Sequence, residues 1–434
     1  MAQVSLLATD MRSGAFDSLL SKLYGADESV LSAQRARYCE TLTAFAKLFG
    51  SDRDASIYSI PGRTELCGNH TDHNGGVVMA SAVDVDMIAV VSKARGGRVR
   101  VFSEDFRGGP GVSLADLSVD KTEVGKSSAM IRGVAAGLRR LHGKVAGFDA
   151  YTASNILKGS GLSSSAAFEI CVGAIFNGEY NDGRFTPVDL AKVGQYAENA
   201  YFGKPSGLMD QVACAVGGVL TIDFQNPLSP VVTKIPFDLA SCGFKLVVTD
   251  TKGSHSSLTD EYAAIRSEME HVARVFGKAN LRAVKREDFF ASIADVRAKT
   301  GDRATLRALH FFEECRRVVE LAAAAERGDI KRFLEIILES GHSSFEYNQN
   351  AYCARETRRQ GIPLALALSQ SVLAGRGAWR LQGGGFAGTI QAFVPNELLE
   401  EYCSTLSGVF GKGACKALTF RGEGPVRING RGGF

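Results

Sequence analysis

The sequence lacks any strong excess of charge, since 50 lysines and arginines stand against 47 aspartates and glutamates. It also has no run of basic residues interleaved with aromatic ones, so we expect no nucleic-acid partner. Hydrophobic residues make up 45% and charged residues 22% of the chain, which excludes a disordered or fibrous protein. A chain of 434 residues with this composition is expected to form two or three packed units. The slightly basic end, residues 421–434, could be a tail that binds a polyanion, but a solvated end is the favoured interpretation.

Motifs for structural metal binding, cross-linking and membrane insertion are missing as well. The nine cysteines are scattered and never spaced as CxxC, which disfavours a zinc centre and a disulfide framework. The most apolar stretch, VVMASAVDVDMIAVV, is interrupted by Asp84 and Asp86, and the first residues, MAQVSLLATDMRSG, lack the features of an export signal. These absences predict a cytoplasmic protein with no membrane partner.

The spacing of apolar residues predicts a mixture of helices and strands rather than a regular βαβ repeat. Residues 15–50 have the pattern of two amphipathic helices, and further helices are expected over 129–142, 260–276 and 305–327. The stretches GRVRVFSED, FDAYTASNIL and TIQAFV are typical of strands. A change of composition at NPLSP, residues 226–230, suggests that a second unit begins near residue 240.

The sequence contains no GxxxxGK[ST], which excludes a Walker-type nucleotide site, but it does contain GSGLSSSAA. Small residues that run into a helix leave backbone N–H groups and a positive helix end open to phosphate, and serine hydroxyls can bind phosphate oxygens or Mg²⁺. An ordinary serine-rich helix start is the alternative, yet a helix cap needs only one serine. We therefore predict an ATP-binding loop that consists of Gly159, Ser160, Gly161, Leu162, Ser163, Ser164 and Ser165.

A second glycine pattern, GxGxxG at Gly383, Gly385 and Gly388, is weak evidence for a dinucleotide site. Such a site follows a strand and opens a helix, whereas this loop precedes the predicted strand TIQAFV. The context rejects the dinucleotide interpretation. Two interpretations remain, a tight turn between elements and a loop that backs an active site.

Polar residues gather in the glycine-flanked segment GRTELCGNHTDHNGG, which includes Arg63, Asn69, His70, Asp72 and His73. Phosphoryl transfer to a sugar hydroxyl requires a proton acceptor, cations for the migrating charge and polar contacts that fix the sugar. This segment offers all of these residue types. A zinc site at the two histidines and the aspartate is less favoured, because no further ligands follow at helical spacing.

Asp210 follows PSGLM and precedes QVACAVGG, which places it at the junction of a loop and a helix. It could simply cap the helix. With Arg63 nearby, however, its carboxylate would stay ionised and could accept a proton, while the arginine would stabilise the charge of the phosphoryl group.

Five segments in this order resemble the galactokinases of the GHMP kinase superfamily. GRTELCGNHTDHNGG resembles the signature GRxNxxGEHTDYNGG, GSGLSSSAA resembles the ATP loop, and AENAYFGKPSGLMDQ resembles AENxxxGxxxGIMDQ. GSHSSLTDEYAAIR resembles HSLxxSEYxxRR, and GGGFAG resembles the third, C-terminal loop. The similarity covers about residues 55–395. One glycine-rich loop would mean little, but five ordered matches are specific.

The resemblance implies an α+β fold in two halves with the active site in the cleft between them. Residues 1–240 would form a ribosomal-protein-S5-domain-2-like half with a left-handed βαβ crossover, and residues 241–434 a ferredoxin-like half. The implied activity is ATP-dependent phosphorylation of the anomeric hydroxyl of galactose, with the small sugar, ATP and Mg²⁺ as partners, in a monomer or weak homodimer.

The resemblance also implies roles for individual residues. Arg63 and Asp210 would be the catalytic pair, with Asp210 accepting or orienting the proton of the anomeric hydroxyl, and Ser165 and Glu198 would hold Mg²⁺. The implied sugar contacts are Asn69, His70, Asp72, Gly207 and Tyr262.

The chain departs from the family pattern at Asn69, His73, Leu157 and Ala387, where galactokinases have Glu, Tyr, Pro and Gly. The galactokinase Glu at the position of Asn69 is thought to meet the C6 hydroxymethyl group of galactose. An amide there would tolerate a C6 carboxylate, which makes a galacturonokinase the alternative. A non-catalytic galactose and ATP sensor is less favoured, because GLSSSAA, Arg63 and Asp210 are all present.

Overall fold

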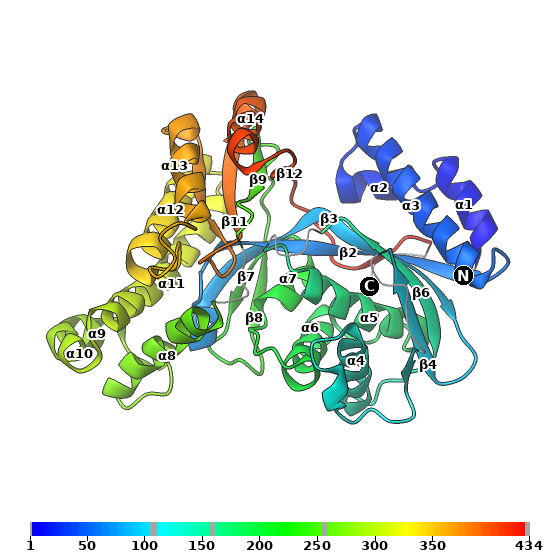
Figure 1. Ribbon diagram of the computed structural model, residues 1–434, viewed down its shortest axis with the longest axis horizontal. Coiled ribbons are helices and arrows are strands. Elements are labelled where there is room, and N and C mark those ends of the chain that lie inside the picture. Colours follow the sequence, from blue (N-terminus) through cyan, green and yellow to red (C-terminus); the bar gives the residue numbers. More distant parts are fainter. Residues whose placement is uncertain (1, 105–110, 157–160, 254–257, 430–434) are drawn as a thin grey trace.

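Two β-sheets of different size organise the chain (Figure 1). The structure is a computed structural model that describes residues 2–104, 111–156, 161–253 and 258–429. Within these residues, the larger sheet consists of β1 (Ala2–Gln3), β2 (Asp54–Cys67), β3 (Val77–Lys93), β4 (Arg98–Ser103), β5 (Val112–Ser113), β6 (Phe148–Ser154), β7 (Val219–Asp223), β8 (Val231–Ile235) and β13 (Val426–Arg427). The smaller sheet consists of β9 (Phe244–Asp250), β10 (Ala378–Gln382), β11 (Thr389–Pro395) and β12 (Cys415–Leu418).

The long antiparallel strands β2 and β3 form the centre of the larger sheet. Their register shifts between Pro61 and Gly62 and again between Glu65 and Cys67. Irregularities of this kind re-aim side chains, and these two flank Arg63. The loop 68–76 joins the two strands and contains one short 3₁₀ turn, η1 (Asp72–Asn74).

Helices cover both faces of the larger sheet (Figure 1). On one face lie α1 (Val4–Arg12), α2 (Asp17–Tyr24) and α3 (Glu28–Phe49), and on the other lie α4 (Ser127–Arg140), α5 (Ser164–Tyr180), α6 (Pro187–Ala197) and α7 (Met209–Val216). The prediction of two helices before β2 was incomplete. The first helix, α1, lies before the predicted range and buries Val4, Leu7 and Met11 on its inner face.

The second half is more helical. Its helices are α8 (Thr259–Val275), α9 (Arg286–Ala291), α10 (Ile293–Thr300), α11 (Asp302–Glu326), α12 (Ile330–Ser343), α13 (Gly361–Leu373) and α14 (Leu399–Phe410). Leu246 and Val248 of β9 pack in the same core as α12, whereas Val247 packs with α13 and α14, as strand alternation requires. The division of the chain at residues 240 and 241 remains a prediction.

Short helical segments connect these elements: η2 (Lys121–Glu123), the π-helix η3 (Glu198–Phe202), η4 (Leu281–Ala283), the π-helix η5 (Ser344–Asn348) and η6 (Asn396–Leu398). No helix among the described residues has the length and apolar character needed to cross a membrane.

The end of the chain returns to the first half. Val426 and Arg427 pair with Ser59 and Tyr58 of β2, and the side chain of Arg421 is 1% exposed. Interpreting this end as a solvated tail was therefore wrong for residues 421–429, because Arg421 finds buried acceptors at Ser59 that composition alone does not reveal.

Candidate active site

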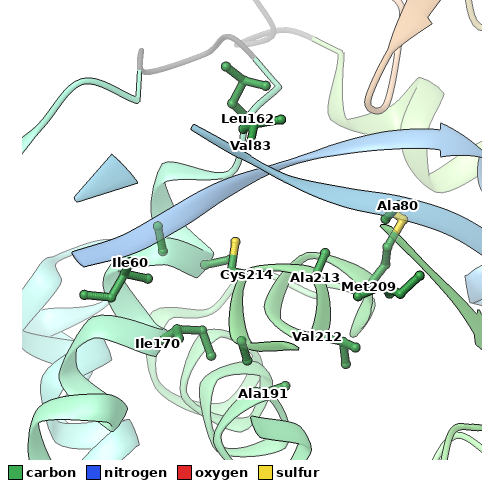
Figure 2. Packing of buried hydrophobic residues seen from close by; sticks show 14 of the residues in the cluster. Ile60, Ala80, Val83, Leu162, Ile170, Ala191, Met209, Val212, Ala213 and Cys214 are labelled. Carbon is green, nitrogen blue, oxygen red and sulfur yellow. The ribbon is translucent and has the colours of Figure 1, made fainter. Parts of the chain in front are cut away.

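Helix α7, which packs against β2, β3, α5 and α6, holds Asp210. Met209, Val212 and Cys214 are buried, and Figure 2 shows Met209 and Cys214 on the side of the helix that faces the strands and Val212 on the side of Ala191 in α6. The helix begins at Met209, and Asp210 is its second residue. The predicted loop-to-helix junction is confirmed, with Leu208 rather than Asp210 at the capping position.

Asp210 forms a two-pronged ion pair with Arg63. Arg63 Nε donates to Asp210 Oδ1 at 2.8 Å and Nη2 donates to Oδ2 at 2.6 Å, and Ser163 Oγ also donates to Oδ2. Burial opposes ionisation of the carboxyl group, but the charge of Arg63 and these hydrogen bonds outweigh it and hold the pKa of Asp210 below its usual value. The Asp210 side chain remains 31% exposed, so an ionised carboxylate faces the open side of the site.

The predicted ATP loop opens helix α5, as the sequence indicated. Ser163 adopts a left-handed conformation with φ of 59°, and the helix starts at Ser164. Arg63 Nη1 and Gln382 Nε2, the latter at 3.0 Å, both donate to the carbonyl of Gly161. The loop is therefore tied to β2 and to β10. Of the predicted ATP-binding residues, Gly161, Leu162, Ser163, Ser164 and Ser165 are described, while Gly159 and Ser160, like Leu157, lie outside the described residues.

An acidic cluster lies behind the ATP loop. Ser165 Oγ is 3.3 Å from Glu198 Oε1, and Gln211 Nε2 joins Glu198 Oε2 at 2.9 Å to Glu169 Oε2 at 3.0 Å. Burial and the neighbouring Glu198 raise the pKa of Glu169 to about 9. Sequence reasoning missed Glu169, although its place four residues after Ser165, one helical turn along α5, is a signal that could have found it.

Lys204 is a second residue that sequence reasoning missed. Its Nζ lies 2.9 Å from Glu198 Oε1, the carboxylate oxygen that Ser165 also contacts. Burial disfavours the ammonium ion, but the charge of Glu198 outweighs it and raises the pKa of Lys204. No group of three or more His, Cys, Asp and Glu residues in the described part of the chain is arranged to hold a metal ion.

Two of the residues expected to contact the sugar, His70 and Tyr262, lie against the loop that follows β10. His70 has φ of 62° and its Nε2 lies 2.9 Å from the carbonyl oxygen of Gly384, while the Tyr262 hydroxyl donates to the carbonyl of Gly385 at 2.7 Å. The ring of His70 lies 6.5 Å from that of Tyr262 and 6.1 Å from that of His73. The GGGFAG loop is the turn of the hairpin β10–β11, which is one of its two predicted roles. Its contacts with His70 and Tyr262 are those that the other predicted role, a loop behind the site, would require.

Asn69 occupies a different environment from these residues. Its side chain is 1% exposed, and its Nδ2 donates to Glu65 Oε1 at 3.0 Å and to the carbonyl of Gly383 at 2.8 Å. Its Oδ1 accepts from Asn350 Nδ2 at 2.7 Å. The structure therefore places the amide of Asn69 inside the protein, behind the loop that carries His70 and Asp72.

Gly207 lies directly against Asp72. A Cβ atom at residue 207 would be 2.0 Å from Asp72 Oδ2, so any side chain must displace that carboxylate. We expect Gly207→Ala to raise the KM for the sugar by roughly 30-fold or more, since a small misplacement of a binding group costs about 100-fold in well-ordered sites. Steady-state kinetics with varied sugar would measure this. Gly97→Ala is the control, because a Cβ atom there meets nothing within 4 Å, and equal KM values for the two variants would contradict the prediction.

Comparisons with known proteins agree on one superfamily. Residues 43–93 match the galactokinase galactose-binding signature and residues 129–218 match the GHMP kinases N terminal domain. A galactokinase of Streptomyces coelicolor is 32% identical over 379 residues, which cover 86% of this chain and 93% of that protein. The crystal structure of Lactococcus lactis galactokinase complexed with galactose matches with a TM-score of 0.77 and 22% identity, over 90% of this chain and all of that one. Methanococcus jannaschii mevalonate kinase matches with a TM-score of 0.60 and 16% identity, over 85% of this chain and 98% of that one.

Proposed function

This chain belongs to the galactokinase family of GHMP kinases, and from that premise we propose that its site transfers the γ-phosphoryl group of ATP to the anomeric hydroxyl of galactose. The observation that carries the proposal is the paired Arg63 and Asp210 at the edge of the ATP loop. An ionised carboxylate, a fixed cation and a helix start of the kind that can bind phosphate meet there, which are the groups that phosphoryl transfer to a hydroxyl requires.

Asp210 and Arg63 divide the chemistry of the transfer. Asp210 accepts a hydrogen bond from the anomeric hydroxyl and takes its proton as the sugar oxygen bonds to the γ-phosphorus, while the bond between that phosphorus and the oxygen leaving with ADP breaks. Arg63 keeps Asp210 ionised and places positive charge beside the transferring group. His70, Asp72, Gly207 and Tyr262 would fix the sugar for in-line attack.

Ser165 and Glu198 would hold Mg²⁺. A hydroxyl and a carboxylate are hard oxygen donors, and Mg²⁺ in kinases is usually held by one or two such groups together with the substrate phosphates, so the residues fit the ion. The ion would supply charge that neutralises the phosphate oxygens. In the structure the ammonium group of Lys204 lies on the Glu198 oxygen nearest Ser165, so Lys204 and the metal would compete for it.

Lys204→Met is therefore expected to strengthen metal binding to the nucleotide-free protein by about twofold to fivefold, because an ion pair whose lysine is exposed is worth about 1 kcal/mol or less. A calorimetric titration with Mg²⁺ or Mn²⁺ would measure this. Lys299→Met is the matched control, since Lys299 pairs with Asp295 at 2.8 Å on the exposed surface of α10. Metal binding that is unchanged or weaker in the Lys204 variant would show that the ammonium group does not compete.

Galactose is favoured over galacturonate as the acceptor, because the Streptomyces coelicolor relative, which is aligned over 86% of this chain, is a galactokinase. The deciding experiment supplies ATP and Mg²⁺ with galactose, galacturonate, glucuronate, N-acetylgalactosamine or glucose, follows ADP release and identifies the phosphorylated position by NMR. We expect galactose 1-phosphate. A preference for galacturonate would make galacturonate the acceptor in place of galactose. If no sugar caused ADP release, the non-catalytic sensor would be favoured.

Three further properties remain proposals. They are Mg²⁺ as the metal, a cytoplasmic location, and a monomer or weak homodimer. Activity with chelated and restored metal, fractionation of cells and sedimentation over a range of protein concentrations would test them in turn.

A further inference from the structure

Glu65 and Asn69 form a buried pair at the base of the loop 68–76, which joins β2 to β3 and is called the sugar loop below. The amide of Asn69 donates to Glu65 Oε1 at 3.0 Å and to Oε2 at 3.3 Å, and both residues are at least 95% buried. Arg380 of β10, which is fully buried, donates to Glu65 Oε1 at 3.2 Å and to the carbonyl of Leu66 at 2.5 Å. One carboxylate, one amide and one guanidinium group therefore occupy a shared pocket between β2 and β10.

The orientation of the Asn69 amide is fixed by its neighbours. Glu65 and the carbonyl of Gly383 are both acceptors, so the amide nitrogen must face them. The amide oxygen then accepts from Asn350 Nδ2, which also donates to the carbonyl of Gly384 at 3.0 Å. Both polar atoms of the Asn69 side chain are thus engaged by the protein, which leaves it no free donor for a sugar hydroxyl.

The same contacts reach His70. The carbonyl oxygen that accepts from Asn350 is also the partner of His70 Nε2 at 2.9 Å, and a carbonyl can only accept, so Nε2 carries the proton. Burial and the neighbouring His73 lower the pKa of His70 to about 3, so the ring is neutral near pH 7 and its Nδ1 is a bare acceptor. Such an atom accepts from a hydroxyl and repels a carboxylate.

We propose that Glu65, Asn69 and Asn350 form a positioning clamp that fixes the sugar loop and the tautomer of His70, and that Glu65 and Asn69 act as one unit whose acid and amide can exchange places. The proposal rests on the proposed function, because it assigns the clamp to the sugar loop of that site. The galactokinase signature GRxNxxGEH supports the exchange, since it carries Asn at the position of Glu65 and Glu at the position of Asn69.

A reciprocal exchange tests the unit. Asn69→Glu places a second carboxylate beside Glu65 and Arg380, and Glu65→Asn leaves Arg380 without its carboxylate. We expect each single variant to weaken galactose binding, measured by calorimetry without ATP, by roughly 30-fold to 100-fold, as for a broken buried charge network. The double variant restores one acid and one amide and should return to within about fivefold of the wild type. If the loss of galactose affinity in the double variant equalled the product of the losses in the two single variants, the proposal would be overturned.

Asn69→Asp keeps the shape of the side chain, so it provides a second test if the variants of the reciprocal exchange do not fold. It places a second carboxylate beside Glu65, and the charged groups that face this pair are Arg380 of β10, Arg63 of β2 and Asp72 of the sugar loop. Two carboxylates in contact share a proton more readily as the pH falls, and the shared proton restores the lost hydrogen bond. The association constant of this variant for galactose, divided by that of the wild type at the same pH, should therefore rise at least fivefold as the pH falls from about 8 to 5.

Asn177→Asp is the matched control for this experiment. Asn177 is equally buried, but it bonds to the backbone of Phe185 beyond α5, away from the sugar loop. It should lower stability without a pH-dependent change in sugar binding relative to the wild type. If the ratio of variant to wild-type galactose affinity did not change with pH for Asn69→Asp, the clamp alone would be overturned. If the wild type bound no sugar of the panel, the proposed function and the clamp would be overturned together.

Discussion

Asp210→Asn is expected to lower kcat for galactose by about a thousandfold or more, within the range that a positioned base contributes, while the dissociation constant for galactose changes by less than about fivefold. The amide has nearly the shape of the carboxylate and still offers one oxygen to Arg63, so the pocket should keep its form. It cannot take the proton of the anomeric hydroxyl. Coupled measurement of ADP release gives kcat, and calorimetry without ATP gives the dissociation constant.

The chain offers a closely matched control for this substitution. Asp223 of β7 pairs with Arg282 at 2.7 Å, and its side chain is 31% exposed, as is that of Asp210. Asp223→Asn removes the same charge from a similar ion pair outside the site and should leave kcat within about twofold, as is usual for an exposed pair. If Asp210→Asn retained a tenth of the wild-type turnover, Asp210 would not be the group that takes the proton.

The local parts of the site could be predicted from the sequence because their chemistry is local. The run of small residues before α5 predicts a loop that opens a helix, and the structure has Ser163 at that helix start. The stretch FDAYTASNIL likewise predicts a strand, and the structure has β6 over Phe148–Ser154. In both places the neighbours that decide the conformation lie within a few residues.

The environment of Asn69 could not be predicted in this way. Its amide is held by Gly383 and Asn350, which lie 314 and 281 residues away along the chain. A sequence pattern shows that an amide stands in the place of an acid but not which atoms surround it. Lys204 was missed for a related reason, because the π-helical turn from Glu198 to Phe202 brings the lysine back onto Glu198.

Arg63→Met is expected to lower kcat by roughly 10²-fold to 10³-fold and to move the acid limb of its pH profile upward. In the wild type, Arg63 holds the pKa of Asp210 below its usual value against the opposing effect of burial, so the carboxylate is ionised through the neutral and mildly acidic range. Methionine fills a similar volume without the charge or the two hydrogen bonds. Burial then acts with less opposition and raises the pKa of Asp210, so the carboxylate takes up a proton at a higher pH and activity is lost earlier on acidification.

Arg63→Lys separates charge from geometry. A lysine keeps the positive charge near Asp210 but cannot donate along two parallel directions, so its kcat should fall while its acid limb stays nearer that of the wild type. Profiles of kcat from about pH 4.5 to pH 8, with Arg282→Met as the control for losing an arginine partner, would distinguish the two effects. An acid limb that stays at the wild-type pH in Arg63→Met would mean that the arginine does not set the protonation state of Asp210. Its contribution would then lie in the charge it presents to the phosphoryl group.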